Sequence, residues 1–151
     1  MNIGTICRRE VVSVDAAEGL AQAAHLMRQR HVGFLVVVQA NSSNADLQVV
    51  GVLTDRDIVT AVVAKDADPR TLKVGDVMTR NPLLAIEAGS IEATVCQMRE
   101  AGVRRVPVVG ARNELIGVLS LDDVLELLAT VIGDVAGAIR TEQRTERISR
   151  T

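Results

Sequence analysis

The chain has 151 residues, of which 48% are hydrophobic and 24% charged, with a formal net charge of -2. A single domain of this length buries about 70% of its unfolded surface, so the composition is that of a folded globular protein. The small net charge offers no broad electrostatic surface for nucleic acid. Phe34 is the sole aromatic residue, so the stacking platforms of single-strand binders are missing as well.

Targeting and metal-binding signals are also missing from the sequence. The N-terminal stretch MNIGTICRREVV lacks the features of a signal peptide, and no window of about 20 apolar residues predicts a membrane span. Cys7 and Cys96 stand apart in apolar company and are expected to be reduced, buried thiols. His25 and His31 have no partner at metal-ligand spacing. We expect a cytoplasmic protein without bound metal, membrane contact or nucleic acid.

The first predicted elements are a helix, two strands and a second helix. The apolar residues of the first helix recur at spacings of three and four, namely Leu20, Ala23, Ala24 and Met27. Runs rich in β-branched residues predict strands over 34–38 and 48–53, separated by a loop over 41–46. Helical spacing returns over 55–64.

The same series recurs after a polar connector over 65–73, which contains Asp68-Pro69. The apolar face of the next helix is formed by Ile91, Thr94, Val95 and Met98. Gly102 is its predicted C-terminal cap, strands follow over 103–109 and 115–119, and a helix begins near 121. A spacing of four from Val131 predicts a helical tail over 134–151. This tail either packs on a second subunit or is a frayed, solvated end.

The recurrence is an internal repeat. A shift of 71 positions (74 minus 3) places 3–7 over 74–78, and after the longer first loop a shift of 66 (117 minus 51) places 51–54 over 117–120. The chain therefore contains two β-α-β-β-α units, 1–64 and 74–133. A unit of about 60 residues is marginally stable alone, so we expect the two units to pack on each other.

The motif with the most chemical content occurs once in each unit, as GVLTDRD from Gly51 and as GVLSLDD from Gly117. In each copy a strand ends at a hydroxyl residue and an Asp follows three positions later. One interpretation is a helix capping box, although that box prefers Glu or Gln to Asp. In the other, each glycine lets backbone approach a ligand, and the carboxylate accepts both hydroxyls of a cis diol such as ribose.

These features together resemble a tandem pair of cystathionine beta-synthase (CBS) domains, the Bateman module. The resemblance rests on GhhTxxD and GhhSxxD, where h is aliphatic, on VGDVMTRNP opening the second unit and on RRVPVV within it. It covers about residues 1–133. It implies an α/β (α+β) fold of two pseudo-symmetric repeats packed sheet against sheet, with a C-terminal helical extension. It also implies a stand-alone, non-enzymatic regulatory protein that forms a homodimer and signals to an unidentified partner protein.

The resemblance further implies clefts that hold an adenosine derivative, such as AMP, ADP, ATP or S-adenosylmethionine, as a regulatory ligand. The ribose hydroxyls would be bound by Thr54 and Asp57 in one cleft and by Ser120 and Asp123 in the other. Residues expected beside the ligand through backbone or aliphatic groups are Gly51, Val12, Val32 and Phe34 in the first unit and Gly117, Leu83 and Val103 in the second. The candidates for phosphate contact are Arg56, Arg104 and Arg105, with surface solubility as the alternative role.

Two other functions compete with nucleotide sensing. The first is a structural dimerisation or protein-interaction module, in which the hydroxyl and Asp residues only cap helices. The second is an enzyme, which is the weakest because the sequence has no catalytic Ser/His/Asp or Cys/His set, P-loop or GxGxxG motif.

Overall fold

The computed structural model describes residues 2–40 and 46–149. The elements of its first half are η1 (Ile3–Thr5), β1 (Ser13–Asp15), α1 (Leu20–Arg30), β2 (Phe34–Ala40), β3 (Leu47–Thr54), α2 (Asp55–Ala61) and η2 (Val63–Lys65). Those of its second half are α3 (Val74–Val77), β4 (Thr79–Arg80), β5 (Ala85–Ile86), α4 (Ile91–Ala101), β6 (Arg105–Val109), β7 (Leu115–Ser120) and α5 (Leu121–Ser149). Most of the loop expected over 41–46 lies outside the described residues.

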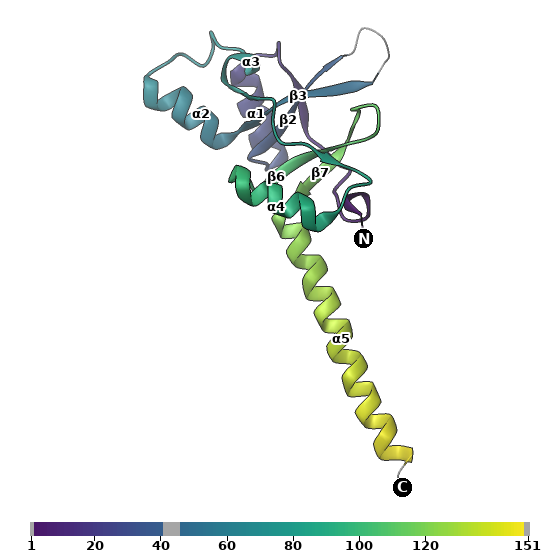
Figure 1. The fold of residues 1–151 in the computed structure, drawn as a ribbon. Helices are drawn as coiled ribbons and strands as arrows, with labels where there is room; N and C mark the ends of the chain where they lie inside the picture. Colours follow the sequence, from purple (N-terminus) through teal and green to yellow (C-terminus); the bar gives the residue numbers. More distant parts are fainter. Residues whose placement is uncertain (1, 41–45, 150–151) are drawn as a thin grey trace.

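The strands form two sheets with matching topology (Figure 1). In the first, β1 pairs in parallel with β2, and β2 pairs antiparallel with β3. In the second, β5, β6 and β7 repeat this pattern. Both hairpins shift register at the same place, between Val37 and Val38 and between Val108 and Val109. The predicted fold of two repeated α/β units is confirmed.

The sheets pack against each other through the alternation of side chains along β2. Leu35 and Val37 face the helices of their own unit, whereas Val36 and Val38 face the second sheet and cluster with Val109. A strand covered on both faces is expected to be apolar throughout, which explains the uninterrupted run from Phe34 to Val38. The bridge between Gln48 and Glu114 links the sheets at their edge.

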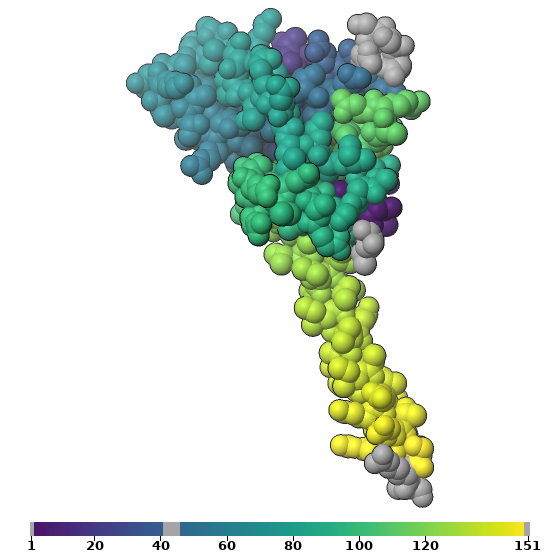
Figure 2. Space-filling view, in the orientation of Figure 1, coloured from purple at the N-terminus to yellow at the C-terminus, as the bar shows by residue number. Residues whose placement is uncertain are grey.

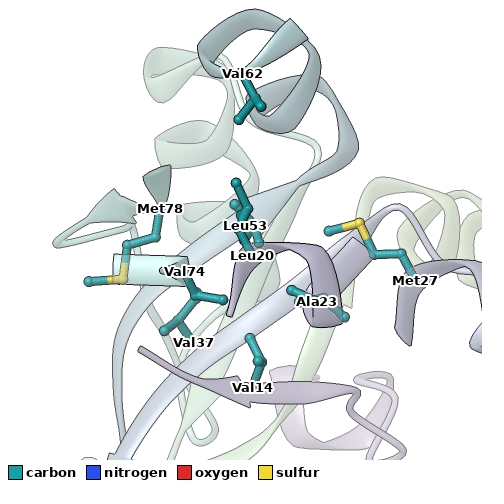
Figure 3. Packing of buried hydrophobic residues seen from close by; sticks show 10 residues of the cluster. Val14, Leu20, Ala23, Met27, Val37, Leu53, Val62, Val74 and Met78 are labelled. Carbon is teal, nitrogen blue, oxygen red and sulfur yellow. The ribbon is translucent and has the colours of Figure 1, made fainter. Parts of the chain in front are cut away.

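The opening segment of each unit packs on the other unit. Ile3 is fully buried in the core of the second unit, and the backbone of Arg8 exchanges two hydrogen bonds of 2.9 Å with that of Val118 in β7. In the opposite direction, Val74 and Met78 complete the core of the first unit (Figure 3), while β4 adds to the edge of β3. The two units are therefore interlocked.

Three local features bear on the sequence predictions. Gly102 adopts a left-handed conformation at the end of α4, as expected of a C-terminal cap. His31 takes the same conformation at the end of α1. Cys96 is exposed, so its expected burial is wrong. The reason is its place on the outer face of α4, because Thr94 and Met98 supply the inner face.

The last helix, α5, runs without a break from Leu121 to Ser149. The boundary expected near residue 133 is therefore not an interruption in the structure. Figures 1 and 2 show that most of α5 projects from the body of the molecule as a rod, with no other segment beside its second half.

Candidate functional site

The hydroxyl and carboxylate of the second motif form a compact hydrogen-bonded unit at the end of β7. The Ser120 N–H donates to Asp123 Oδ2 at 3.0 Å, the Ser120 hydroxyl donates to the same oxygen, and the Asp123 N–H donates to Ser120 Oγ at 3.2 Å. Both residues are buried. The strand end fixes Ser120 and the first turn of α5 fixes Asp123, so the pair is held rigidly.

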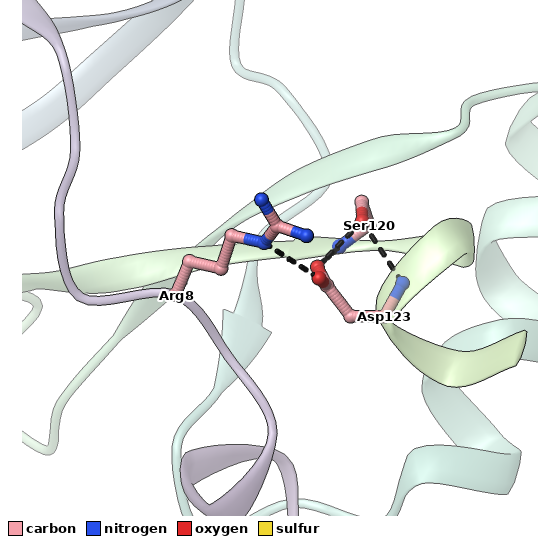
Figure 4. A network of polar contacts seen from close by, with 3 residues as sticks. All are labelled: Arg8, Ser120 and Asp123. Atoms are coloured by element: carbon pink, nitrogen blue, oxygen red, sulfur yellow. Dashed lines mark hydrogen bonds and ion pairs between the residues drawn. The ribbon is translucent and has the colours of Figure 1, made fainter. Parts of the chain in front are cut away.

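The second oxygen of this carboxylate is paired with a residue 115 positions away. Arg8 Nε donates to Asp123 Oδ1 at 2.7 Å (Figure 4). The Arg8 side chain is 66% exposed, whereas that of Asp123 is 6% exposed. The contact depends on the crossed packing of the units, because the N-terminal segment brings Arg8 alongside β7.

The pKa of Asp123 reflects a balance between burial and hydrogen bonding. Burial alone raises this pKa, but the hydrogen bonds from Ser120 and the hydrogen bond and charge of Arg8 outweigh it, and the net pKa lies below its ordinary value. Asp123 is therefore a buried carboxylate that stays ionised. Such a group needs charged or hydrogen-bonding partners at all times.

A cavity of about 300 Å³ opens beside this carboxylate, between the two units. Its apolar lining comes mainly from the first unit, which also contributes Arg8, Glu10 and His31. The end of β7 and the start of α5 contribute mainly polar residues. The predicted site residues that line it are Val12, Val32, Phe34, Arg105, Ser120 and Asp123, and the other lining residues are Arg8, Glu10, Val11, His31, Gly33, Val118 and Asp122.

The equivalent pair of the first motif does not line this cavity. Thr54 and Asp57 form a reciprocal capping box at the start of α2, with the Thr54 N–H donating to Asp57 Oδ2 at 2.8 Å and the Asp57 N–H to Thr54 Oγ1 at 3.1 Å. The capping interpretation thus describes the geometry seen at both motifs. What distinguishes Ser120 and Asp123 is the cavity in front of them.

The two motif glycines have a role other than ligand approach. A Cβ at Gly51 would lie 2.8 Å from the Thr79 carbonyl oxygen, and one at Gly117 would lie 2.6 Å from the Arg8 carbonyl oxygen. Both distances are too short for a side chain. The backbone that approaches each glycine therefore belongs to the crossed opening segments of the chain itself, whereas a ligand contact at Gly51 or Gly117 stays a prediction.

The remaining predicted contacts also lie outside the cavity lining. These residues are Arg56, Leu83, Val103 and Arg104. Arg104 instead faces Asp122 at 3.7 Å on the surface. The sequence reasoning missed Arg8 and His31. The position of His31 directly after the amphipathic helix α1 could have indicated it. No local pattern in the sequence indicates Arg8.

No helix within residues 2–40 and 46–149 has the length and apolar character needed to cross a bilayer. Over the same residues, no three His, Cys, Asp or Glu side chains gather closely enough to hold a metal ion.

The fold and the cavity define a two-unit α/β module with a cavity lined by residues of both units. The family model described as CBS domain matches residues 3–64 and again 74–130. The chain belongs to the CBS-domain family.

Known relatives and solved structures agree with this assignment. Hypoxic response protein 1 of Mycobacterium tuberculosis is 34% identical over 125 residues, covering 82% of this chain and 78% of that protein. Its crystal structure, which has two coordinated zinc ions, matches with a TM-score of 0.71 at 29% identity over 83% of this chain and 98% of that one. The uncharacterized protein MK0525 of Methanopyrus kandleri is 28% identical over 135 residues, which cover 87% of this chain and 66% of that protein.

A third similar protein was solved with ligands. The CBS domain pair of MJ0100, in complex with methylthioadenosine and S-adenosylmethionine, has a TM-score of 0.71 to this chain. The match covers 85% of this chain and 99% of that one at 20% identity. At this identity the likeness concerns the fold.

Proposed function

We propose that this protein is a non-catalytic sensor that binds an adenosine-type ligand, such as AMP, ADP, ATP or S-adenosylmethionine, in the cavity between its two units. The observation that carries the proposal is the ionised, buried carboxylate of Asp123 in the lining of a cavity of about 300 Å³ that also contains apolar side chains of the first unit. This volume is at the lower end of the range for small-molecule sites, about 300 to 1,000 Å³.

The polar and apolar parts of the lining match the two parts of a nucleoside. A carboxylate can accept a hydrogen bond from each hydroxyl of a ribose diol. The apolar part, with Val12, Val32 and Phe34, presents aliphatic and aromatic surface and backbone groups to a flat base. Arg105 in the cavity lining is the cation available to a phosphate or carboxylate of the ligand.

Ligand binding in this arrangement requires that one of the hydrogen-bond donors to the Asp123 carboxylate is replaced. A carboxylate has about four acceptor positions, and three are taken by the Ser120 N–H, the Ser120 hydroxyl and Arg8 Nε. A ribose that donates two hydrogen bonds therefore displaces Arg8. The exposed Arg8 side chain then becomes available beside the cavity, where it adds a second cation for an anionic group.

The direct test is thermal unfolding of the full chain with AMP, ATP, NAD and S-adenosylmethionine in turn. A ligand at 100 times its Kd adds about 2.7 kcal/mol of stability, which for this size raises the Tm by roughly 5 to 11 °C. The matching 2′-deoxynucleotide serves as the control, because it lacks one hydroxyl of the diol and should bind more weakly. No shift with any of the four compounds at millimolar concentration would contradict the proposal.

The alternative function, a ligand-free structural module, is favoured by the capping geometry at both motifs. The two motifs supply a matched pair of variants to decide between them. Ser120→Ala and Thr54→Ala should each destabilise the fold by about 1 kcal/mol through the lost cap. Only Ser120→Ala should also weaken ligand binding, measured by isothermal titration calorimetry. Equal and unchanged binding in both variants would show that the ligand does not bind at Ser120, and no binding to the unaltered chain would favour the structural module.

The same proposal includes the setting in which the sensor works. The module has no catalytic role, acts in the cytoplasm as a homodimer and passes a ligand-dependent change in conformation to a partner protein. Because only the second motif faces the cavity, we expect one ligand per chain at this site. A stoichiometry of two would indicate that Thr54 and Asp57 form a second site.

A further inference from the structure

The projecting part of α5 carries a row of exposed apolar side chains. Leu125, Ile132 and Val135 are 63%, 68% and 56% exposed, and Leu128 and Ile139 are each 50% exposed. Nothing in the described chain covers this row, and Figure 2 shows the rod standing clear of the body. An exposed apolar face of this extent marks an interaction surface.

The spacing of the row is that of a coiled-coil seam. Successive members are separated by three, four, three and four positions, which is the heptad pattern, and they extend over about 21 Å of helix. The positions that flank the seam are small or apolar and carry no charge, namely Ala129, Val131, Ala136 and Ala138. The face is therefore suited to close approach by another helix.

The composition of α5 makes it a poor helix on its own. Gly133 and Gly137 lie in its projecting part, and each glycine in a helix interior costs about 0.8 to 1.0 kcal/mol relative to alanine. A helix in water draws most of its stability from packing of its apolar face. A partner along the seam supplies that packing.

The charges of α5 indicate the direction of a helix that pairs with it. Residues 121–134 contain four acidic and no basic residues, whereas 135–149 contain three arginines and two glutamates, a net charge of +1 (3 minus 2). Asp122 and Asp123 of the acidic stretch are paired with Arg104 and Arg8 in the body, so Glu126 and Asp134 are its acidic residues that can face a partner helix. An antiparallel second copy places Glu126 level with Arg140. A parallel copy aligns like charges instead, and the seam positions after Ile139 would then oppose Glu142 to Glu142 and Glu146 to Glu146.

We infer that α5 binds α5 of a second copy of this chain as an antiparallel pair, with Leu128 of one copy beside Ile139 of the other. This interface does not depend on ligand binding. It places the two bodies at opposite ends of the helix pair.

The first test compares two variants that add the same charge to α5. Ile132→Glu lies in the seam, and Thr130→Glu lies on the opposite side of the helix. In sedimentation equilibrium of the full chain, Ile132→Glu should raise the dimer dissociation constant at least tenfold, because it places a charge in the apolar seam. Thr130→Glu should leave that constant nearly unchanged. Cooperative thermal unfolding of both variants checks that the body remains folded.

The second test measures direction. A nitroxide is attached at Ser149→Cys in a chain that also carries Cys7→Ala and Cys96→Ser, and the distance between labels is measured by pulsed electron resonance. An antiparallel pair centred between Ile132 and Val135 places the two labels about 45 Å apart, whereas a parallel pair places them within about 15 Å.

Three results would overturn the inference. These are a monomer at all concentrations, a dimer that Ile132→Glu does not weaken, and a short distance between the labels. Binding of monomeric protein to anionic vesicles, lost in Ile132→Glu, would instead identify α5 as a membrane-surface helix.

Discussion

At the scale of single residues, the Asp123 carboxylate makes two kinds of contact. It caps α5 together with Ser120, and it holds Arg8 across the junction between the units. The motif in the sequence indicated Ser120 and Asp123, but it indicated Thr54 and Asp57 equally, and these do not line the cavity. It could not reveal Arg8, because a contact between residues 115 positions apart leaves no periodic signal along the chain.

The lowered pKa of Asp123 predicts acid sensitivity. A carboxyl whose pKa is lower in the folded than in the unfolded state adds stability that is fully present above the unfolded value, near 3.9. That stability is lost as the pH falls through the folded value. Asp123→Asn should destabilise the fold by about 1 to 3 kcal/mol at pH 7.

Urea unfolding between pH 7 and about pH 2.5 checks this prediction. The difference in unfolding free energy between the wild type and Asp123→Asn should shrink as the pH falls below about 4. A difference that stays constant over this range would show that the ionised carboxylate does not stabilise the fold.

At the scale of elements, the longer helices and strands of both units were predictable from spacing. The short elements β1, α3, β4 and β5 were not located, and the roles of the glycines required the structure. Gly117 and Gly137 show why. Gly117 stands in a strand against the Arg8 backbone, whereas at Gly137 a Cβ would meet only Arg140 Nη2, at 3.9 Å. The sequence does not distinguish the two glycines. Only the packing shows that the backbone lies close to Gly117 and that the space beside Gly137 is open.

The same substitution at these two positions should therefore have opposite effects. Gly137→Ala should stabilise α5 by about 0.8 to 1.0 kcal/mol and increase the helical signal in circular dichroism. Gly117→Ala should lower the Tm, because its Cβ would lie 2.6 Å from a carbonyl oxygen. Loss of helical signal in Gly137→Ala would mean that α5 needs flexibility at this position.

At the scale of the whole molecule, the repeat in the sequence was sufficient to predict two similar units that pack together. It did not predict that their opening segments cross over. Because 3–7 and 74–78 occupy equivalent positions in the repeat, their apolar pattern does not tell which of the two cores each segment enters. The choice is made by chain geometry that spacing does not record.

Crossed packing predicts that the extreme N-terminus is essential for stability. Ile3→Ala should destabilise the protein by about 2 to 5 kcal/mol, as for a core residue, although terminal residues are commonly dispensable. Thr5→Ala, an exposed position in the same turn, should change stability by less than about 0.5 kcal/mol. Calorimetry should show a single transition for both, and two separate transitions would mean that the units unfold independently.

The unbroken helix α5 also has a mechanical consequence. Its first turn contains the carboxylate beside the cavity, and its 29 residues extend about 43 Å from that turn. The helix is thus a lever whose fixed end lies beside the cavity. A rocking of about 5° at the base sweeps Ser149 through about 4 Å, an amplification that follows from helix length alone.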